Sequence, residues 1–201
     1  MVLVGRVVNN KSDFYVGLSL LKGSRQLWKQ TMSPGVGLEI LWAPDSRAFS
    51  VSSSHQAPNG WFDTQVFVID PDGFVQEVDV TTPVLQAFGD PVECAWPEPP
   101  NVGAVRWLGS SRKILIAAEI VRHRVCDSYG TFHAYEVSLP YPEIVGTLDQ
   151  LQAKQLYRKD LGDNLTKAPD ACILHPKTCW LPSNHPTGAT HYRQSSFPKS
   201  P

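Results

Sequence analysis

A cluster of cysteine and histidine residues near the C-terminus has the side-chain types of a metal site. The stretch CILHPKTCWLPSNHPTGATH holds Cys172, His175, Cys179, His185 and His191. Thiolate and imidazole are the ligands that zinc prefers, and the first four of these residues would close a tetrahedral site. The spacing C-x2-H-x3-C-x5-H matches no paired zinc-finger pattern, so a Cys172–Cys179 disulfide or free thiols among solvated histidines is the simpler hypothesis.

The other two cysteines, Cys94 and Cys126, lie in separate loops. In an exported protein a disulfide between them would tie one loop to the next group of strands and add a few kcal/mol of stability. Two unpaired thiols remain an equal alternative, because composition does not settle the redox compartment.

A second group of reactive residue types lies in the loop RHRVCDSYGTFH, which contains His123, Cys126, Asp127 and His133. A cysteine beside a histidine is a potential nucleophile with its base. Neighbours along one loop rarely hold that geometry, and the sequence has no G-x-S-x-G, no glycine-rich phosphate loop and no H-E-x-x-H. We therefore expect no enzymatic activity and no cofactor.

Four side chains are candidate ligand contacts. Trp61 and Phe62 would be a contact hot spot if they were exposed at a loop tip, although both rings are equally compatible with the start of a buried strand. Arg122 and Arg124, in the basic run VRHR, would contact an anion or form a solvated loop.

Short strands joined by tight turns must position these residues. Residues 13–30, 37–54 and 62–80 each contain two apolar runs with partial alternation, separated by KGS, APDS and PDG. Proline and aspartate favour such turns, and glycine supplies the positive φ of a hairpin. Each of these segments therefore predicts a pair of antiparallel strands.

The pattern is repeated further along the chain. The segment GAVRWLGSSRKILIAAEI, residues 103–120, again has a strand that ends in tryptophan, a small polar turn and a second strand. Repetition of a four-strand unit is the signature of a repeat architecture. The matched residues are Trp42 with Trp107, Ser46 with Ser111 and Arg47 with Arg112.

A strand ending in Trp, a Pro-Asp-Ser-Arg turn, a serine-rich strand, a third strand and an Asp-Gly hairpin resemble one blade of a TolB-like β-propeller, a relative of WD-type repeats. The resemblance covers roughly residues 1–145 and implies an all-β, partial β-propeller of four-stranded antiparallel blades. It makes Trp42 and Trp107 packing residues between stacked sheets. The chain has two clear blades and the latter part of another, whereas closed propellers have about 4–8. Completion by further blades, a second copy or a partner is therefore expected.

The chain divides into regions of different character. Residues 147–161 predict a short helix with Leu148, Leu151 and Leu156 on one side, and the later residues lose periodicity. The expected division is blades over 1–146 with boundaries near 37 and 102, an insertion over 81–101 with a helix at 82–88, the helix over 147–161, and an irregular or disordered tail over 162–201.

Composition narrows the class of partner. Of 201 residues, 42% are apolar and 18% charged, and the net charge is −1, which argues against a nucleic-acid partner. No apolar run approaches the roughly 20 residues of a membrane span. The start, MVLVGRVVNNK, is no signal peptide as it stands, so we expect a cytoplasmic protein, or an exported one if an upstream segment is missing.

These features favour a non-enzymatic binding or scaffold module that recognises a protein or peptide through blade loops. Formation of a homo-oligomer is a further expectation. The alternative is a propeller segment that accompanies a hydrolase domain of the prolyl-oligopeptidase type, with that domain absent from this chain.

Overall fold

Eleven strands and three helices make up the described part of the computed structural model, residues 1–10, 13–32, 37–54, 62–89, 100–120 and 130–168. The strands form three antiparallel sheets in which strands adjacent in sequence pair with each other. Sheet I contains β1 (Val2–Asn10), β2 (Asp13–Lys22) and β3 (Arg25–Met32). Sheet II contains β4 (Leu38–Trp42), β5 (Ala48–Ser54), β6 (Phe62–Ile69) and β7 (Val75–Val78). Sheet III contains β8 (Asn101–Trp107), β9 (Lys113–Glu119), β10 (Phe132–Ser138) and β11 (Glu143–Leu148).

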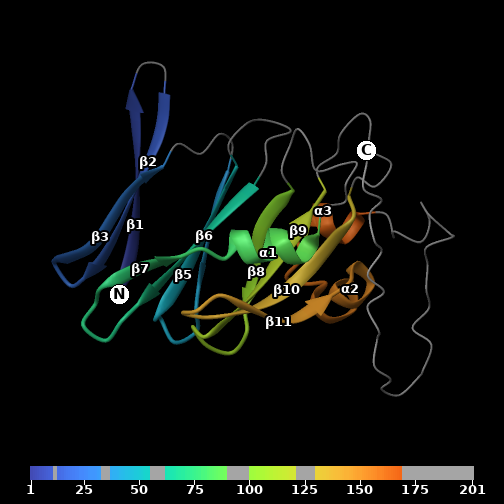
Figure 1. Cartoon of the computed structure of the whole chain (residues 1–201). Coiled ribbons are helices and arrows are strands. Elements are labelled where there is room, and N and C mark those ends of the chain that lie inside the picture. Colours follow the sequence, from blue (N-terminus) through green and yellow to red (C-terminus); the bar gives the residue numbers. More distant parts are fainter. Residues whose placement is uncertain (11–12, 33–36, 55–61, 90–99, 121–129, 169–201) are drawn as a thin grey trace, which may run out of the picture.

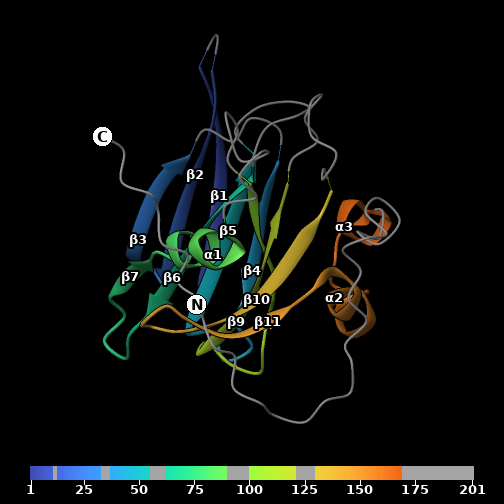
Figure 2. The ribbon, with the colours of Figure 1, turned by 45° about the vertical axis from the view of Figure 1, so that its right-hand side comes forward.

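The three sheets follow one another across the molecule, with sheet II in the middle (Figure 1). Helix α1 (Thr81–Phe88) contacts β6 of sheet II and both β9 and β11 of sheet III. Helices α2 (Gln150–Tyr157) and α3 (Asp163–Lys167) lie at the far end of the array, beside sheet III (Figure 2). The all-β class with four-stranded antiparallel sheets is thus confirmed, and the arrangement is compatible with a propeller-like fold.

Turn chemistry explains where the strands reverse. Gly23 and Gly73 have φ of 61° and 89°, which the β2–β3 and β6–β7 hairpins require and which glycine adopts without strain. In the β4–β5 turn, Asp45 Oδ1 accepts the Arg47 N–H at 3.2 Å. In the β8–β9 turn, Ser110 Oγ accepts the Arg112 N–H at the same distance. The two turns are therefore closed by the same local side-chain bond.

The two tryptophans matched in the sequence end the first strands of sheets II and III. Trp42 ends β4 opposite Phe49, and Trp107 ends β8 opposite Ile114. Both tryptophans pack against the preceding sheet, Trp42 in the core between sheets I and II and Trp107 in the core between sheets II and III. Both are therefore packing residues, but Trp107 is buried and Trp42 only half-buried.

Each junction between sheets has its own apolar core. Between sheets I and II, Phe49 and Phe67 stack with ring centroids 4.9 Å apart, and Trp28 lies 4.8 Å from Phe67. Burying such apolar surface contributes roughly 25 cal/mol per Å². The largest fully buried side chain, Tyr135, belongs to the core between sheets II and III.

The serine-rich strand β5 has a role that apolar residues could not fill. Ser52 Oγ and Thr64 Oγ1 lie 2.8 Å apart in the interior. Thr64 donates to the Val102 carbonyl at 2.8 Å, and both oxygens lie within 3.3 Å of the Ala104 nitrogen. Backbone groups on the outer edge of β8 are thereby satisfied by side chains of sheet II.

The helices differ in part from expectation. Helix α1 matches the helix predicted at 82–88, but Leu148 belongs to β11, and Leu151 and Leu156 of α2 are 58% and 65% exposed. The prediction that these three leucines lie on one side of a single helix is wrong, because Leu148 is a strand residue. The small, buried Ala153 is the α2 residue that faces the sheet. Part of the predicted irregular tail, Asp163–Lys167, is helical. None of the described helices has the length and apolarity to cross a membrane.

Candidate functional site

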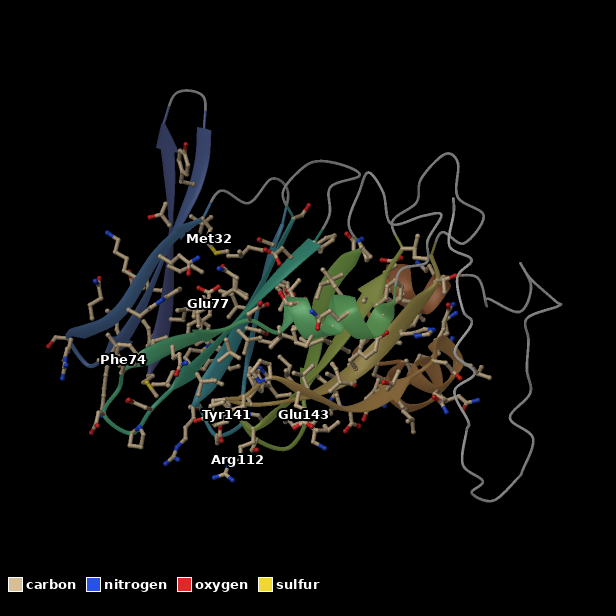
Figure 3. All side chains as sticks on the ribbon, in the orientation of Figure 1. Met32, Phe74, Glu77, Arg112, Tyr141 and Glu143 are labelled. Atoms are coloured by element: carbon tan, nitrogen blue, oxygen red, sulfur yellow. The ribbon has the colours of Figure 1, made fainter. Side chains whose placement is uncertain are left out.

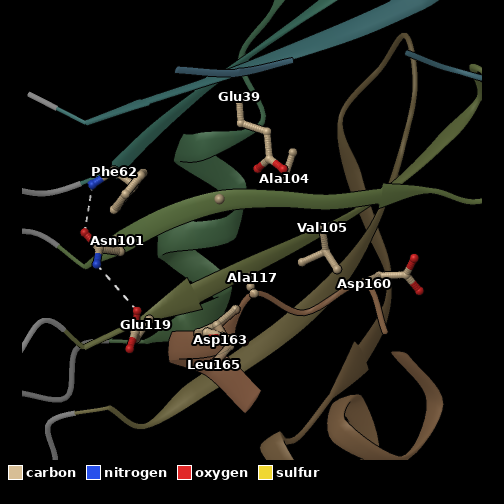
Figure 4. A pocket seen from close by; sticks show the side chains of 12 residues that line it. Glu39, Phe62, Asn101, Ala104, Val105, Ala117, Glu119, Asp160, Asp163 and Leu165 are labelled. Carbon is tan, nitrogen blue, oxygen red and sulfur yellow. Dashed lines mark hydrogen bonds between the residues drawn. The ribbon is translucent and has the colours of Figure 1, made fainter. Parts of the chain in front are cut away.

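An open cleft of about 310 Å³ lies where the first strands of sheets II and III meet the segment around α3 (Figure 4). Strand alternation turns Glu39 of β4 toward the sheet III side, and the neighbouring strands β8 and β9 form one wall. The lining residues are Glu39, Phe62, Asn101, Gly103, Ala104, Val105, Ala117, Glu119, Asp160, Gly162, Asp163 and Leu165.

Asn101 joins two sheets at the cleft. Its side-chain oxygen accepts the Phe62 N–H at 2.7 Å, and its amide nitrogen donates to Glu119 Oε2 at 3.5 Å (Figure 4). Asn101 and Glu119 are also direct register partners in sheet III. One amide therefore fixes the start of β6 and the end of β9 together.

The environment of Glu119 disfavours its charged form. Burial raises the pKa of this carboxyl, and the hydrogen bond from Asn101 opposes the rise only in part. A cation brought into the cleft would lower the pKa again by stabilising the carboxylate. Glu119 is thus a lining carboxyl whose charged form a cationic ligand would stabilise.

The remaining carboxylates differ in how they are neutralised. Asp160 forms an ion pair with Arg106 at 2.9 Å, and Arg106 also lies 5.8 Å from the Tyr157 ring centroid. Asp163 pairs with Lys167 at 2.8 Å within α3, where both side chains are largely exposed. Among the described residues, no ion pair is found for Glu39 or Glu119. Counting only the described groups, four carboxylates line the cleft and two of them are paired with cations, which leaves a negative balance.

The structure places one predicted contact residue in the cleft. Phe62 lines it and is 41% exposed, and its backbone is held by Asn101. The other predicted site residues lie outside the described residues and stay predictions: Trp61, Arg122 and Arg124 as contacts, Cys172, His175, Cys179 and His185 as metal ligands, and Cys94 with Cys126 as a disulfide.

His133 is the described member of the potential nucleophile group. Its ring packs edge-on against Phe88 of α1, 5.7 Å between centroids, and burial lowers its pKa while Asp149 opposes that shift. Its suggested partners Cys126 and Asp127 lie outside the described residues. In the described ranges, no group of three or more His, Cys, Asp or Glu side chains could hold a metal ion.

Two aromatic side chains at hairpin turns are exposed to solvent (Figure 3). Phe74 follows the β6–β7 turn and is 68% exposed, and Tyr141 lies in the β10–β11 turn and is 85% exposed. These turns connect the third and fourth strands of sheets II and III, so they occupy equivalent places in the two sheets. Exposed aromatic rings of this kind are enriched in protein contacts.

Sequence reasoning missed Glu39, Asn101 and Glu119. Glu119 interrupts the apolar run ILIAAEI, and Asn101 directly follows the proline-rich stretch, so both are polar residues at strand ends. Their proximity depends on the pairing of β8 with β9, which residue spacing alone does not provide.

Comparisons of the chain with models of protein families, with curated proteins and with solved structures found no match. The protein is a mostly β array of antiparallel sheets with an acidic cleft. Function must therefore be argued from the chain's own geometry and charge.

Proposed function

We propose that this chain is a non-enzymatic module that binds a protein or peptide partner, with the acidic cleft receiving a basic side chain of that partner. The observation that carries the proposal is the excess of carboxylates around the cleft, where Glu39 and Glu119 have no ion-pair partner among the described residues. A lysine or arginine head group would supply the missing charge.

The dimensions and lining of the cleft support a side chain as its occupant. A volume of about 310 Å³ lies at the lower end of the range for ligand pockets, roughly 300–1,000 Å³. Phe62, Val105 and Leu165 provide apolar surface beside the carboxylates. Lysine and arginine place an apolar stem against such surface and keep the charged head near polar groups.

The repeat architecture supports the same proposal. Rigid sheets with variable turns are a common platform for binding a partner. The proposal includes that the sheets resemble blades of a TolB-like propeller. The exposed Phe74 and Tyr141 at equivalent turns offer additional aromatic contacts.

Selection from a random peptide display library on the immobilised chain would test the proposal. We expect enriched peptides to contain lysine or arginine, and their affinity to fall as salt is raised. The double variant Glu39→Gln and Glu119→Gln should weaken a selected peptide by about tenfold or more, because two charge-assisted contacts are lost.

Glu143→Gln is the matched control, since Glu143 is exposed in the β10–β11 hairpin and loses the same type of charge. It should leave affinity unchanged. Unfolding curves of the variants would show that the fold is intact. Enrichment without basic residues, or equal binding by the double variant and the parent, would overturn the proposal.

A further inference from the structure

Sheet I has three strands, whereas sheets II and III each have four. The β2–β3 hairpin corresponds to the β6–β7 and β10–β11 hairpins, so β1 corresponds to β5 and β9. Strand β5 pairs with β4 on its other side, and β9 pairs with β8. Strand β1 pairs with β2 alone in the part of the chain that the structure describes. The position of a first strand in sheet I is therefore unfilled by the described residues.

The neighbouring strand β4 shows the consequence of this unfilled position. Leu38, Ile40 and Trp42 point toward the core between sheets I and II, and all three are only half-buried. Aligning β5 with β9 so that the partners of the two tryptophans coincide gives the equivalent residues on β8. They are Val102, Ala104 and Trp107. These equivalents are 1%, 7% and 5% exposed.

Strand β8 is covered by three strands of the preceding sheet, β4, β5 and β6, and the first of these covers its tryptophan. Strand β4 contacts β8, and the Leu41 side chain packs against the core that contains Trp107. The Trp107 indole N–H donates to the Leu41 carbonyl at 3.0 Å. No corresponding acceptor for the Trp42 indole is found among the described residues, because no strand of sheet I occupies the place of β4.

We propose that the free edge of β1 and the half-buried flank of Leu38, Ile40 and Trp42 form a groove that binds an extended strand of a partner polypeptide. The strand pairs antiparallel with β1, as β4 does with β5, and completes sheet I. One of its carbonyls accepts the Trp42 indole N–H, as the Leu41 carbonyl does for Trp107.

The chemistry of the groove defines the occupant. A strand edge presents backbone N–H and C=O groups at the spacing of another strand, so an extended backbone pairs with it and a helix does not. The groove continues the core between sheets I and II, which already includes Leu3 of β1 and the three residues of β4. Side chains of the bound strand that face β4 are therefore apolar.

The opposite side of the bound strand has a different neighbour. Val2 and Val4 of β1 point away from sheet II and are 61% and 42% exposed. An apolar residue beside them would cover this surface, so the preferred strand is apolar on both faces near these valines. A second copy of the chain fits less well, because in sheets II and III the same place holds one strand rather than a whole sheet.

This inference is independent of the acidic cleft. Glu39 lines the cleft from one face of β4, while Leu38, Ile40 and Trp42 project from the other face. Loss of cleft binding would leave the groove intact, and the reverse also holds.

The strand that occupies this place in sheet II supplies a probe. A fluorescent peptide with the sequence of residues 37–44, GLEILWAP, should bind the full chain saturably, while a scrambled peptide of the same composition should not. Methylation of alternate backbone nitrogens gives two matched peptides. The peptide methylated at the nitrogens that pair with β1 should bind at least tenfold more weakly. The peptide methylated at the nitrogens that face away from β1 should retain its affinity.

Hydrogen exchange on the same complex would locate the peptide. The β1 amides and the Trp42 indole N–H, assigned with a Trp42→Phe variant, should exchange more slowly when the peptide is bound. Absence of binding, equal loss for both methylated series, or protection elsewhere would overturn the proposal. A free chain that sediments as a dimer with its β1 amides already protected would also overturn it, because a second copy would then fill the groove.

Discussion

The two ends of the sheet array are finished differently. The outer face of sheet III is covered by α2 and α3, and Leu115, Ala117, Phe132 and Ala134 are buried there. No described element covers the outer face of sheet I, where Val2 and Val4 remain exposed. Among the described residues, two short helices therefore cover the sheet at one end of the array, and the sheet at the other end has no such cover.

A helix cap and a cluster of buried side chains hold α2 and α3 against sheet III. Asp149 begins α2 with a capping box, in which its carboxylate accepts the Gln152 N–H at 2.8 Å and the Gln152 side chain accepts the Asp149 N–H at 3.0 Å. Ala153, with no exposed surface, lets the helix approach the sheet. Leu161 then closes the cluster between α2 and α3.

The two sheet junctions repeat this contrast on a smaller scale. Trp107 is covered by β4 and hydrogen-bonded to the Leu41 carbonyl, whereas no described strand covers Trp42 from sheet I in the same way. Comparing the two tryptophans thus shows how much of the burial of such a side chain depends on the neighbouring strand.

Truncation of the two tryptophans should give the largest difference. Trp107→Ala is expected to lower the free energy of unfolding by about 3–5 kcal/mol, since it creates a cavity and leaves the Leu41 carbonyl without its donor. Trp42→Ala should cost roughly half as much, because less of its surface is buried. Urea unfolding followed by circular dichroism would measure both. Equal losses would show that the two junctions are covered alike.

Much of the antiparallel strand arrangement is predictable from sequence. The KGS, APDS and PDG turns fix the hairpins through residues with special backbone preferences, and the spacing of Trp42 and Trp107 identifies equivalent strand ends. The acidic cleft is not predictable in the same way. It requires Glu39, Asn101 and Asp163, far apart in the chain, to meet through sheet stacking and helix docking.

The capping helices show the limit of periodicity. Leucine spacing predicted Leu148, Leu151 and Leu156 on one side of a helix, but Leu148 belongs to β11 and Ala153 is the α2 residue packed against the sheet. The size of apolar side chains is therefore a weaker guide to the buried side of such a helix than how closely its residues pack against the sheet.

The covered end can be weakened selectively. Leu161→Ala should destabilise the chain by about 2–5 kcal/mol, because Leu161 is 5% exposed within the helix–sheet cluster. Leu156→Ala is the matched control, since Leu156 is 65% exposed, and it should change stability by no more than about 0.5 kcal/mol. Thermal unfolding would compare them. Similar effects of both substitutions would mean that α2 and α3 do not cover sheet III in solution.

The smallest effect concerns a bond between turns of adjacent sheets. Asp45 Oδ2 accepts the Ser111 N–H at 3.1 Å and the Ser111 hydroxyl at 2.8 Å, so the β4–β5 turn is tied to the β8–β9 turn. Ser110 holds the place of Asp45 in sheet III and bonds only within its own turn. Asp45 thus has a neighbouring sheet to contact, and Ser110 has none among the described residues.

This bond should give a pH-dependent contribution to stability. Burial raises the pKa of the Asp45 carboxyl, but the hydrogen bonds from Ser111 and Arg47 together outweigh it and hold the pKa below its ordinary value of 3.8. The contribution is therefore present above pH 3.8 and is lost as pH falls through the lower folded pKa. Asp45→Asn should cost about 0.5–1 kcal/mol at pH 7, because the site is exposed.

Urea unfolding of Asp45→Asn and parent across this pH range should show the difference shrinking as the carboxyl protonates. Asp72→Asn removes the same charge from the exposed β6–β7 turn and should show no such convergence. A constant difference between Asp45→Asn and the parent at all pH values would mean that the neutral amide loses shape complementarity rather than charge. The hydrogen bonds between the β4–β5 and β8–β9 turns would then stabilise the chain through the fit of the two turns and not through the charge of Asp45.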